Sequence, residues 1–201
     1  MKEQQPLSRL TLKVSGTSLP LFTTLLQSGI EAKTENGTSL GRFLGGFPGF
    51  TADYLAEVVQ TIFLNGTAVD DLTIPLAGEK PVLALSAAMP GLAGAIFRKN
   101  SFHAALRTDT AAKTSDPQKN EIITVILKLF NSIARERGEE LLRRGVCLQT
   151  KTLAEFFERR ANLLQEIHLI QADGANIDLP DLARYLAEHD RTHLTIEKAD
   201  D

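Results

Sequence analysis

The sequence predicts an α+β protein in which helices and strands alternate along a chain of 201 residues. Three observations support this class. Residues 9–15 alternate apolar and polar side chains, which is the period of a half-buried strand. Residues 61–72 form a strand, an Asn-Gly turn and a return strand, and an uncharged run follows from Pro81. The segments at 121–144 and 152–164 carry their apolar residues at helical spacing.

The first half is expected to consist of short elements. A helix over residues 19–26 ends at a glycine, and residues 30–33 form a second strand. Thr38 or Ser39 caps a helix that the glycine cluster at 45–49 interrupts, and helix resumes over 51–59. The glycines near Arg42 lie inside this helix rather than after a strand, so we interpret them as packing positions and not as a phosphate loop.

The uncharged run from Pro81 to Phe97 is expected to be a buried strand that continues into an apolar loop. It contains Pro90 and two glycines and is shorter than the roughly 20 apolar residues that span a bilayer, so no transmembrane segment is predicted. Residues 107–120 hold almost no large apolar side chain and are interpreted as a linker. This interpretation divides the chain into an α+β domain at 1–106 and a helix-rich α+β domain at 121–201.

In the second half, the apolar residues of 122–133 cover nearly the whole circumference of a helical wheel. Such a helix is buried in the core of its own domain or against another subunit, and it is expected to run to Arg144 before Gly145. A strand at 146–149 precedes a capping box, Thr152 to Glu155, which opens the next helix. A strand at 167–170, an Asp-Gly turn and a helix at 181–188 follow, and the charged tail from Asp190 is expected to fray.

The two halves repeat one order of elements. Each offers a helix, a glycine, a strand, a capped helix, a strand, an Asn-Gly or Asp-Gly turn, and a return strand. The two turns stand at Asn65-Gly66 and Asp173-Gly174. An internal duplication explains this order, and so does independent use of common turn and cap residues.

Composition excludes several classes. Twenty-two Lys and Arg against 25 Asp and Glu give a charge of −3, which offers no general attraction to nucleic acid or anionic membranes. Cys147 is the only cysteine, so no intramolecular disulfide is possible, and the N-terminus lacks a secretory pattern. A cytoplasmic protein is the interpretation.

The helix before Thr61, the segment Thr61-Ile62-Phe63-Leu64-Asn65-Gly66, and the strand before Pro90-Gly91-Leu92-Ala93-Gly94 resemble the β-grasp proteins of the ubiquitin-like sulfur-carrier group. The resemblance covers residues 9–94 and implies a β-grasp-like fold that docks partners. Sulfur carriers activate the free carboxylate of a C-terminal Gly-Gly. Here Gly94 is followed by a long further stretch of chain, so the resemblance does not carry over the carrier chemistry.

Catalytic, cofactor and metal motifs are not found. Cys147 has no neighbouring histidine in the sequence and is interpreted as a structural thiol. His189 and His193 have the i, i+4 spacing of a helical metal pair, but Asp190 or Glu197 would have to serve as the third ligand, and a solvated tail is the preferred interpretation. No cofactor, metal or catalytic residue is therefore assigned.

The preferred hypothesis is a non-enzymatic interaction or assembly protein that self-associates or binds a protein partner. The alternative is a small-molecule-binding protein or enzyme with a pocket between the two subdomains, floored by Gly91 to Gly94 and rimmed by Arg98, Lys99 or His103. Under the preferred hypothesis the interaction surface consists of apolar residues in the two uncharged segments and one basic pair: Met89, Pro90, Leu92, Ile96, Phe97, Arg98, Lys99, Ile122, Ile126 and Phe130.

Overall fold

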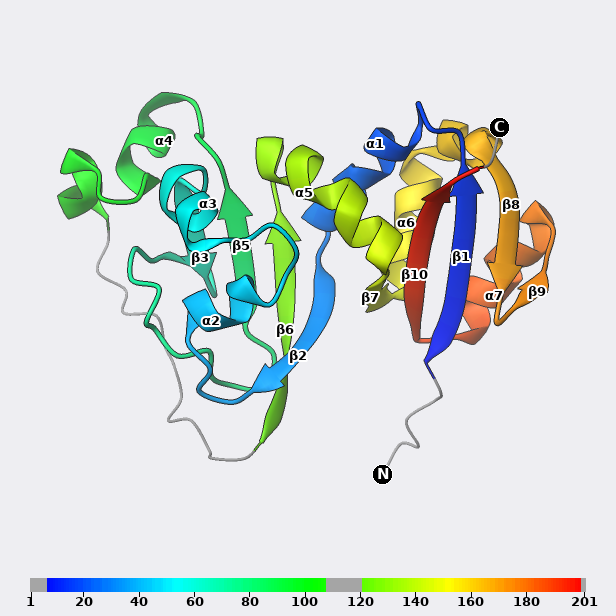
Figure 1. Ribbon diagram of the computed structural model, residues 1–201, viewed down its shortest axis with the longest axis horizontal. Helices are drawn as coiled ribbons and strands as arrows, with labels where there is room; N and C mark the ends of the chain where they lie inside the picture. The colour runs from blue at the N-terminus through cyan, green and yellow to red at the C-terminus, as the bar shows by residue number, and fades with distance from the viewer. Residues whose placement is uncertain (1–6, 108–120, 200–201) are drawn as a thin grey trace. The chain divides into compact units, whose positions relative to one another are not determined.

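The computed structural model describes residues 7–107 and 121–199 of the chain. Helices and strands are mixed throughout these residues, which confirms the combination of α and β structure. The chain forms two compact units (Figure 1): unit 1 comprises Met1–Ile30 and Gly138–Asp201, and unit 2 comprises Glu31–Arg137. The chain therefore passes between the units twice, once at strand β2 (Ile30–Glu35) and once in helix α5 (Asn131–Arg144).

These units differ from the division that the sequence suggested. The predicted linker at 107–120 lies outside the described residues except for Arg107. The first strand belongs with the end of the chain because β1 (Ser8–Val14) pairs in parallel with β10 (Arg191–Lys198). A pairing between the two ends of a chain leaves no local pattern in the sequence, and a composition-based boundary does not detect it.

In unit 1 the strands follow the order β7-β10-β1-β8-β9. β1 is antiparallel to β8, β8 is antiparallel to β9, and β10 is antiparallel to β7. Figure 1 shows α6 and α7 behind these strands. The remaining elements of unit 1 are β7 (Val146–Gln149), β8 (Ile167–Ala172), β9 (Ala175–Asn176), α1 (Leu19–Phe22), the 3-10 helices η1 (Thr23–Gln27) and η3 (Ala161–Glu166), α6 (Thr150–Arg159) and α7 (Leu179–Glu188).

Alternate side chains of the two central strands form the core of unit 1. Leu12 of β1 and Ile196 of β10 are 0% exposed and are partners in the parallel register. Phe22 packs against the rings of Phe156 and Phe157 with centroid distances of 6.2 and 6.5 Å. The prediction of a fraying tail from Asp190 is therefore wrong, because every second residue from Thr192 to Ile196 enters the core.

Two smaller predictions in unit 1 are also corrected. Helix α6 begins at Thr150, so Thr152 lies inside the helix and does not cap it. Helix α7 ends at Glu188 and His193 lies in β10, so His189 and His193 do not share a helix face. Gly145 follows α5 with a φ of +91°, as the predicted end of that helix requires.

In unit 2 the strands follow the order β4-β3-β5-β6-β2. β3 is antiparallel to both β4 and β5, and β5 is parallel to β6. Ser39 and Thr51 cap the two helices between β2 and β3 through their side-chain oxygens. The remaining elements are α2 (Leu40–Gly45), α3 (Ala52–Glu57), β3 (Thr61–Leu64), β4 (Thr67–Ala68), β5 (Val82–Ser86), α4 (Gly91–Phe97), the 3-10 helix η2 (Phe102–Leu106) and β6 (Ile122–Leu129).

The predicted helix at 122–133 is wrong in its first eight residues, which form strand β6. Burial alternates along it: Ile123, Val125, Leu127 and Leu129 are at most 3% exposed. Five of its residues are β-branched, and such residues favour the pleated strand over the helix. Helix begins only at Asn131 and then continues to Arg144, where the sequence predicted its end.

The two units share one turn and one pairing pattern. Asn65 and Asp173 have φ values of +51° and +50°, and the glycines after them have +82° and +87°, so both turns require left-handed backbone at two successive residues. Asn65 exchanges two hydrogen bonds of 2.8 Å with the backbone of Val82, one through its N–H and one through Oδ1. Asp173 makes the same two bonds, also of 2.8 Å, with Arg9.

Candidate functional site

The segment after β5 is helical rather than the predicted apolar loop. Pro90 precedes α4, and small residues let this helix pack closely on the chain before it: a Cβ at Gly94 would lie 1.8 Å from the carbonyl oxygen of Met89. Helix η2 follows after a short connection and contacts α4. We call α4 and η2 together, residues 91–106, the α4–η2 segment.

The α4–η2 segment leaves large apolar side chains in solvent. Leu92 is 71% exposed, Leu106 is 65% exposed and Phe102 is 96% exposed. Each is more exposed than any other large apolar side chain of the described residues. Exposed apolar side chains mark a contact surface where several of them occur close together, so these three residues are the candidate contact residues of the segment.

Arg107 anchors this segment to unit 2. Its guanidinium donates to the carbonyl oxygens of Ile96 at 2.9 Å and Arg98 at 2.6 Å, and to the carboxylate of Asp70 at 2.7 Å. The Arg107 side chain is only 13% exposed. The fork geometry of arginine suits such a set of acceptors, so the segment is held by polar bonds while its apolar side chains stay outside.

Lys99 provides a second anchor. Its ammonium donates to the carbonyl oxygens of Leu55, Ala56 and Val59, at 2.6, 3.2 and 3.0 Å. These carbonyls lie at the end of helix α3, where backbone acceptors lack intrahelical partners. Burial lowers the pKa of Lys99, and the nearby Asp70 opposes that shift. Lys99 therefore serves the fold and is not a solvated cation.

The other residues of the predicted surface are placed as follows. Phe97 packs its ring edge to face against Phe63, 5.3 Å between centroids. Arg98 is exposed and donates through Nε to Gln60. Pro90 is exposed and Ile122, on β6, is 60% exposed. The half-buried members are Met89, Ile96, Ile126 and Phe130.

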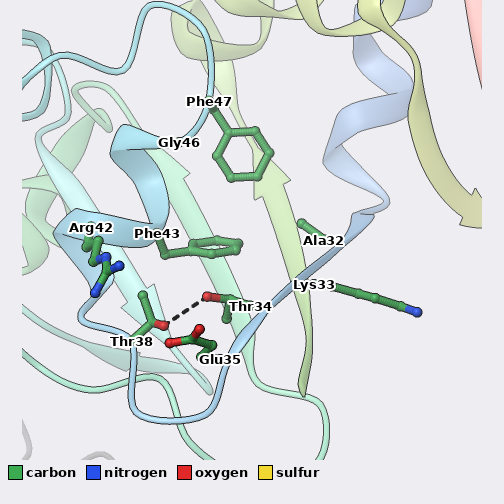
Figure 2. A pocket seen from close by; sticks show the side chains of 9 residues that line it. All are labelled: Ala32, Lys33, Thr34, Glu35, Thr38, Arg42, Phe43, Gly46 and Phe47. Atoms are coloured by element: carbon green, nitrogen blue, oxygen red, sulfur yellow. Dashed lines mark hydrogen bonds between the residues drawn. The ribbon is translucent and has the colours of Figure 1, made fainter. Parts of the chain in front are cut away.

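A separate pocket of about 470 Å³ lies between β2 and α2 (Figure 2). The chain turns back after β2, with the Thr38 N–H bonded to the carbonyl of Glu35 at 3.0 Å, and this turn places the helix beside the strand. All of the lining residues belong to unit 2: Ala32, Lys33, Thr34, Glu35, Thr38, Arg42, Phe43, Gly46 and Phe47.

The pocket combines an aromatic wall with hydroxyl and charged groups. The rings of Phe43 and Phe47 meet edge to face at 5.3 Å, and the Thr34 hydroxyl donates to that of Thr38 at 3.0 Å. Figure 2 shows the Phe47 ring pointing toward Phe43, while the Lys33 chain extends away from the helix. We call this site the Phe43–Phe47 pocket.

Unit 1 brings together two groups that the sequence separates. Cys147 and His193 are register partners on the antiparallel strands β7 and β10, and both are half-buried. The imidazole of His193 lies so close to Gly145 that a Cβ there would be 2.1 Å from its Cε1. Cys147 therefore has no histidine near it in the sequence, but it has His193 as its register partner on the neighbouring strand. Within residues 7–107 and 121–199, three or more metal-ligating side chains do not converge.

Comparison with models of protein families, with curated proteins and with solved structures finds no match for this chain. Among the described helices, none combines the length and apolar character of a membrane span. The geometry of the sites therefore carries the functional argument.

Sequence reasoning missed the Arg107 anchor and the Phe43–Phe47 pocket. The partners of Arg107 are mostly backbone carbonyls, which have no signature in a sequence. The pocket had a signal, because two glycines, Gly45 and Gly46, separate Phe43 from Phe47 at the end of the predicted helix. We interpreted those glycines as packing positions.

Proposed function

We propose that this protein is a non-enzymatic interaction or assembly module that binds a protein partner, or a second copy of itself, through the α4–η2 segment. One observation carries the proposal: Leu92, Phe102 and Leu106 are exposed on a segment that Arg107 and Lys99 hold in place. Ordering a segment costs conformational entropy, and a segment whose apolar side chains stay exposed returns little folding free energy to offset that cost. Binding supplies a reason for that order.

The expected strength of the contact follows from these side chains. Burying three of them contributes about 5–9 kcal/mol at 1.5–3 kcal/mol each. Association costs a similar amount in lost translational and rotational freedom. The segment alone therefore supports a weak or reversible complex, and a tight one requires a partner that also covers further exposed residues such as Arg98.

We further propose a β-grasp-like fold for the resembling residues 9–94, of which residues 31–94 belong to unit 2. The capped helices before β3 and the Asn65-Gly66 turn after it support this assignment. Gly91 to Gly94 lie in the first turn of α4 and not at a chain end, so partner docking, without carrier chemistry, is the function proposed for this fold. The cytoplasm is the compartment proposed, supported by the single cysteine.

We also propose that the two units arose by duplication. The matching hydrogen bonds of Asn65 with Val82 and of Asp173 with Arg9 support this, as do the matching strand pairs. In unit 2 the β3–β4 hairpin is followed in the sheet by β5, antiparallel to β3, and then by β6, parallel to β5. In unit 1 the β8–β9 hairpin is followed by β1, antiparallel to β8, and then by β10, parallel to β1.

The interaction proposal is tested with Phe102→Ser and Leu106→Ser, and with Leu21→Ser as a matched control on an exposed leucine of unit 1, 46% exposed. Sedimentation velocity over a range of concentrations measures self-association. A photo-crosslinking amino acid at position 102, in cells of the source organism, captures a heterologous partner. We expect a discrete adduct or a concentration-dependent oligomer, lost in the two segment variants and kept in Leu21→Ser. A strict monomer that forms no discrete adduct at position 102 would remove the proposal.

A further inference from the structure

The Phe43–Phe47 pocket is lined by charged side chains that make no ion pair with the part of the chain that the structure describes. Among the described residues, none of the ion pairs involves Lys33, Glu35 or Arg42. The Arg42 guanidinium likewise makes none of the side-chain hydrogen bonds found in the described part of the chain, although its backbone N–H binds the Ser39 cap. A guanidinium has five donors in a planar fork that matches a carboxylate or phosphate.

The hydroxyl groups point to the same class of ligand. Because the Thr34 hydroxyl donates its proton to the oxygen of Thr38, the proton of Thr38 remains available to a ligand. The Lys33 chain extends away from the helix (Figure 2), so Arg42 is the cation of the lining that can reach a ligand. The guanidinium donors of Arg42 and the Thr38 hydroxyl together favour an anionic group.

The aromatic wall indicates what else the ligand carries. Phe43 is 7% exposed and packs edge to face against Phe47, and both rings line the cavity. A volume of about 470 Å³ is within the range of small-molecule sites. A third ring that stacks on this pair gains offset or edge-to-face contacts that an aliphatic chain does not make.

Gly46 leaves space at the pocket although its backbone does not require glycine. Its φ is −74°, and a Cβ there would meet only the carbonyl oxygen of Phe43, at 3.2 Å. The conformational freedom of glycine is therefore unused at this position. A larger side chain would occupy space next to the aromatic pair, which gives a direct way to fill the site.

We infer that the Phe43–Phe47 pocket binds a small organic anion that carries an aromatic ring, with Arg42 and Thr38 holding the anionic group and the two phenylalanines holding the ring. This ligand site is separate from the α4–η2 segment, and it does not depend on the interaction function proposed above.

The test uses the full chain and three probes: 3-phenylpropionate, propionate without the ring, and phenethylamine without the carboxylate. Backbone amide shifts in two-dimensional NMR report binding and locate it. We expect 3-phenylpropionate to bind with a dissociation constant on the order of 1 mM and to shift the amides of 32–47. Propionate and phenethylamine are each expected to bind at least about tenfold more weakly, because each lacks one of the two contacts.

Three variants separate this pocket from other apolar surfaces. Gly46→Met fills the pocket and is expected to weaken 3-phenylpropionate binding more than about tenfold. Gly45→Met is the matched control, because Gly45 does not line the pocket and a Cβ there meets nothing within 4 Å. Arg42→Gln is expected to weaken binding about tenfold. Binding that survives Gly46→Met, equal binding of phenethylamine, or no shift in residues 32–47 overturns the inference. Phe102→Ser leaves probe binding unchanged if the two sites are separate, so the test also distinguishes this inference from the interaction proposal.

Discussion

The strand at the end of the chain provides the most direct test of the fold. Ile196 of β10 is 0% exposed and pairs with Leu12 of β1. Ile196→Ala removes three carbon groups, worth roughly 2.4 kcal/mol at about 0.8 kcal/mol each. The cavity left behind raises the expected loss of unfolding free energy to about 3–4 kcal/mol. Ile196→Val removes one group and is expected to cost about 1 kcal/mol.

Urea unfolding followed by far-ultraviolet circular dichroism measures these losses, since the chain has no tryptophan for a fluorescence signal. Thr195→Ala, on the other face of β10, is the control and is expected to change stability by less than about 0.5 kcal/mol. Amide hydrogen exchange in β1 should accelerate in Ile196→Ala, because β1 loses its packed partner. A loss below about 1 kcal/mol for Ile196→Ala, or unchanged exchange in β1, would show that the tail is not part of the core.

Three further changes test the anchors and turns. Arg107→Met removes the three hydrogen bonds that hold the α4–η2 segment, so the rate of amide hydrogen exchange in residues 91–106 should rise at least about tenfold while the rates in unit 1 stay unchanged. Equal exchange rates in the variant and the original protein would contradict the anchoring role of Arg107. Burial and a hydrogen bond to the Glu136 carboxylate raise the pKa of Tyr54 to about 12 from 10.0, so its neutral form stabilises the fold below pH 10 and this contribution is lost as the pH rises toward 12. Burial also raises the pKa of Tyr185, so the tyrosinate absorbance of Tyr54→Phe is subtracted from that of the original protein to isolate Tyr54, and a midpoint near 10 for this difference would refute the burial argument. Gly145→Ala must displace the His193 ring and also strains a φ of +91°, whereas Gly66→Ala, at a φ of +82°, meets open space. In urea unfolding, Gly145→Ala should therefore lower the free energy of unfolding by at least about 1 kcal/mol more than Gly66→Ala does. Equal losses of unfolding free energy would show that the His193 ring moves aside freely.

The sequence predicted most elements whose ends carry a specific residue. Gly29 and Gly145 mark helix ends with positive φ, Ser39 caps α2, and Asn65-Gly66 turns β3 into β4. Each of these residues acts on its own backbone, so the signal lies within a few positions of the structure that it produces. The predicted boundaries were therefore accurate at these residues, whereas the capping box at Thr152 placed the start of α6, which is at Thr150, too late.

Predictions failed where the period of the apolar pattern was ambiguous. Between Ile122 and Leu129 only Thr124 and Lys128 are polar, so the alternation of a strand is hidden in a nearly continuous apolar run. In β10 the alternation was visible at Leu194 and Ile196, but the acidic and basic residues around them suggested a solvated tail. The charges lie on the less buried face of that strand.

The candidate site was predicted only in part. The exposure of Leu92 was predicted because the apolar run from Pro81 to Phe97 is too long for a small core to bury completely. The roles of Lys99 and Arg107 did not follow, because their acceptors are backbone carbonyls and a carboxylate at positions far along the chain. Sequence patterns report neighbours in helices and strands, whereas these bonds depend on how loops fold back.

The parallel pairing of the first strand with the last one has a consequence for synthesis on the ribosome. Ser8 of β1 pairs with Thr192 of β10, so unit 1 cannot complete its sheet until the residues of β10 have emerged. At 5–20 residues per second, β1 waits roughly 10–40 s for its partner, while residues 31–137 emerge without interruption. Unit 2 is therefore able to fold first, and the apolar face of β1 must be protected from other nascent chains during that interval.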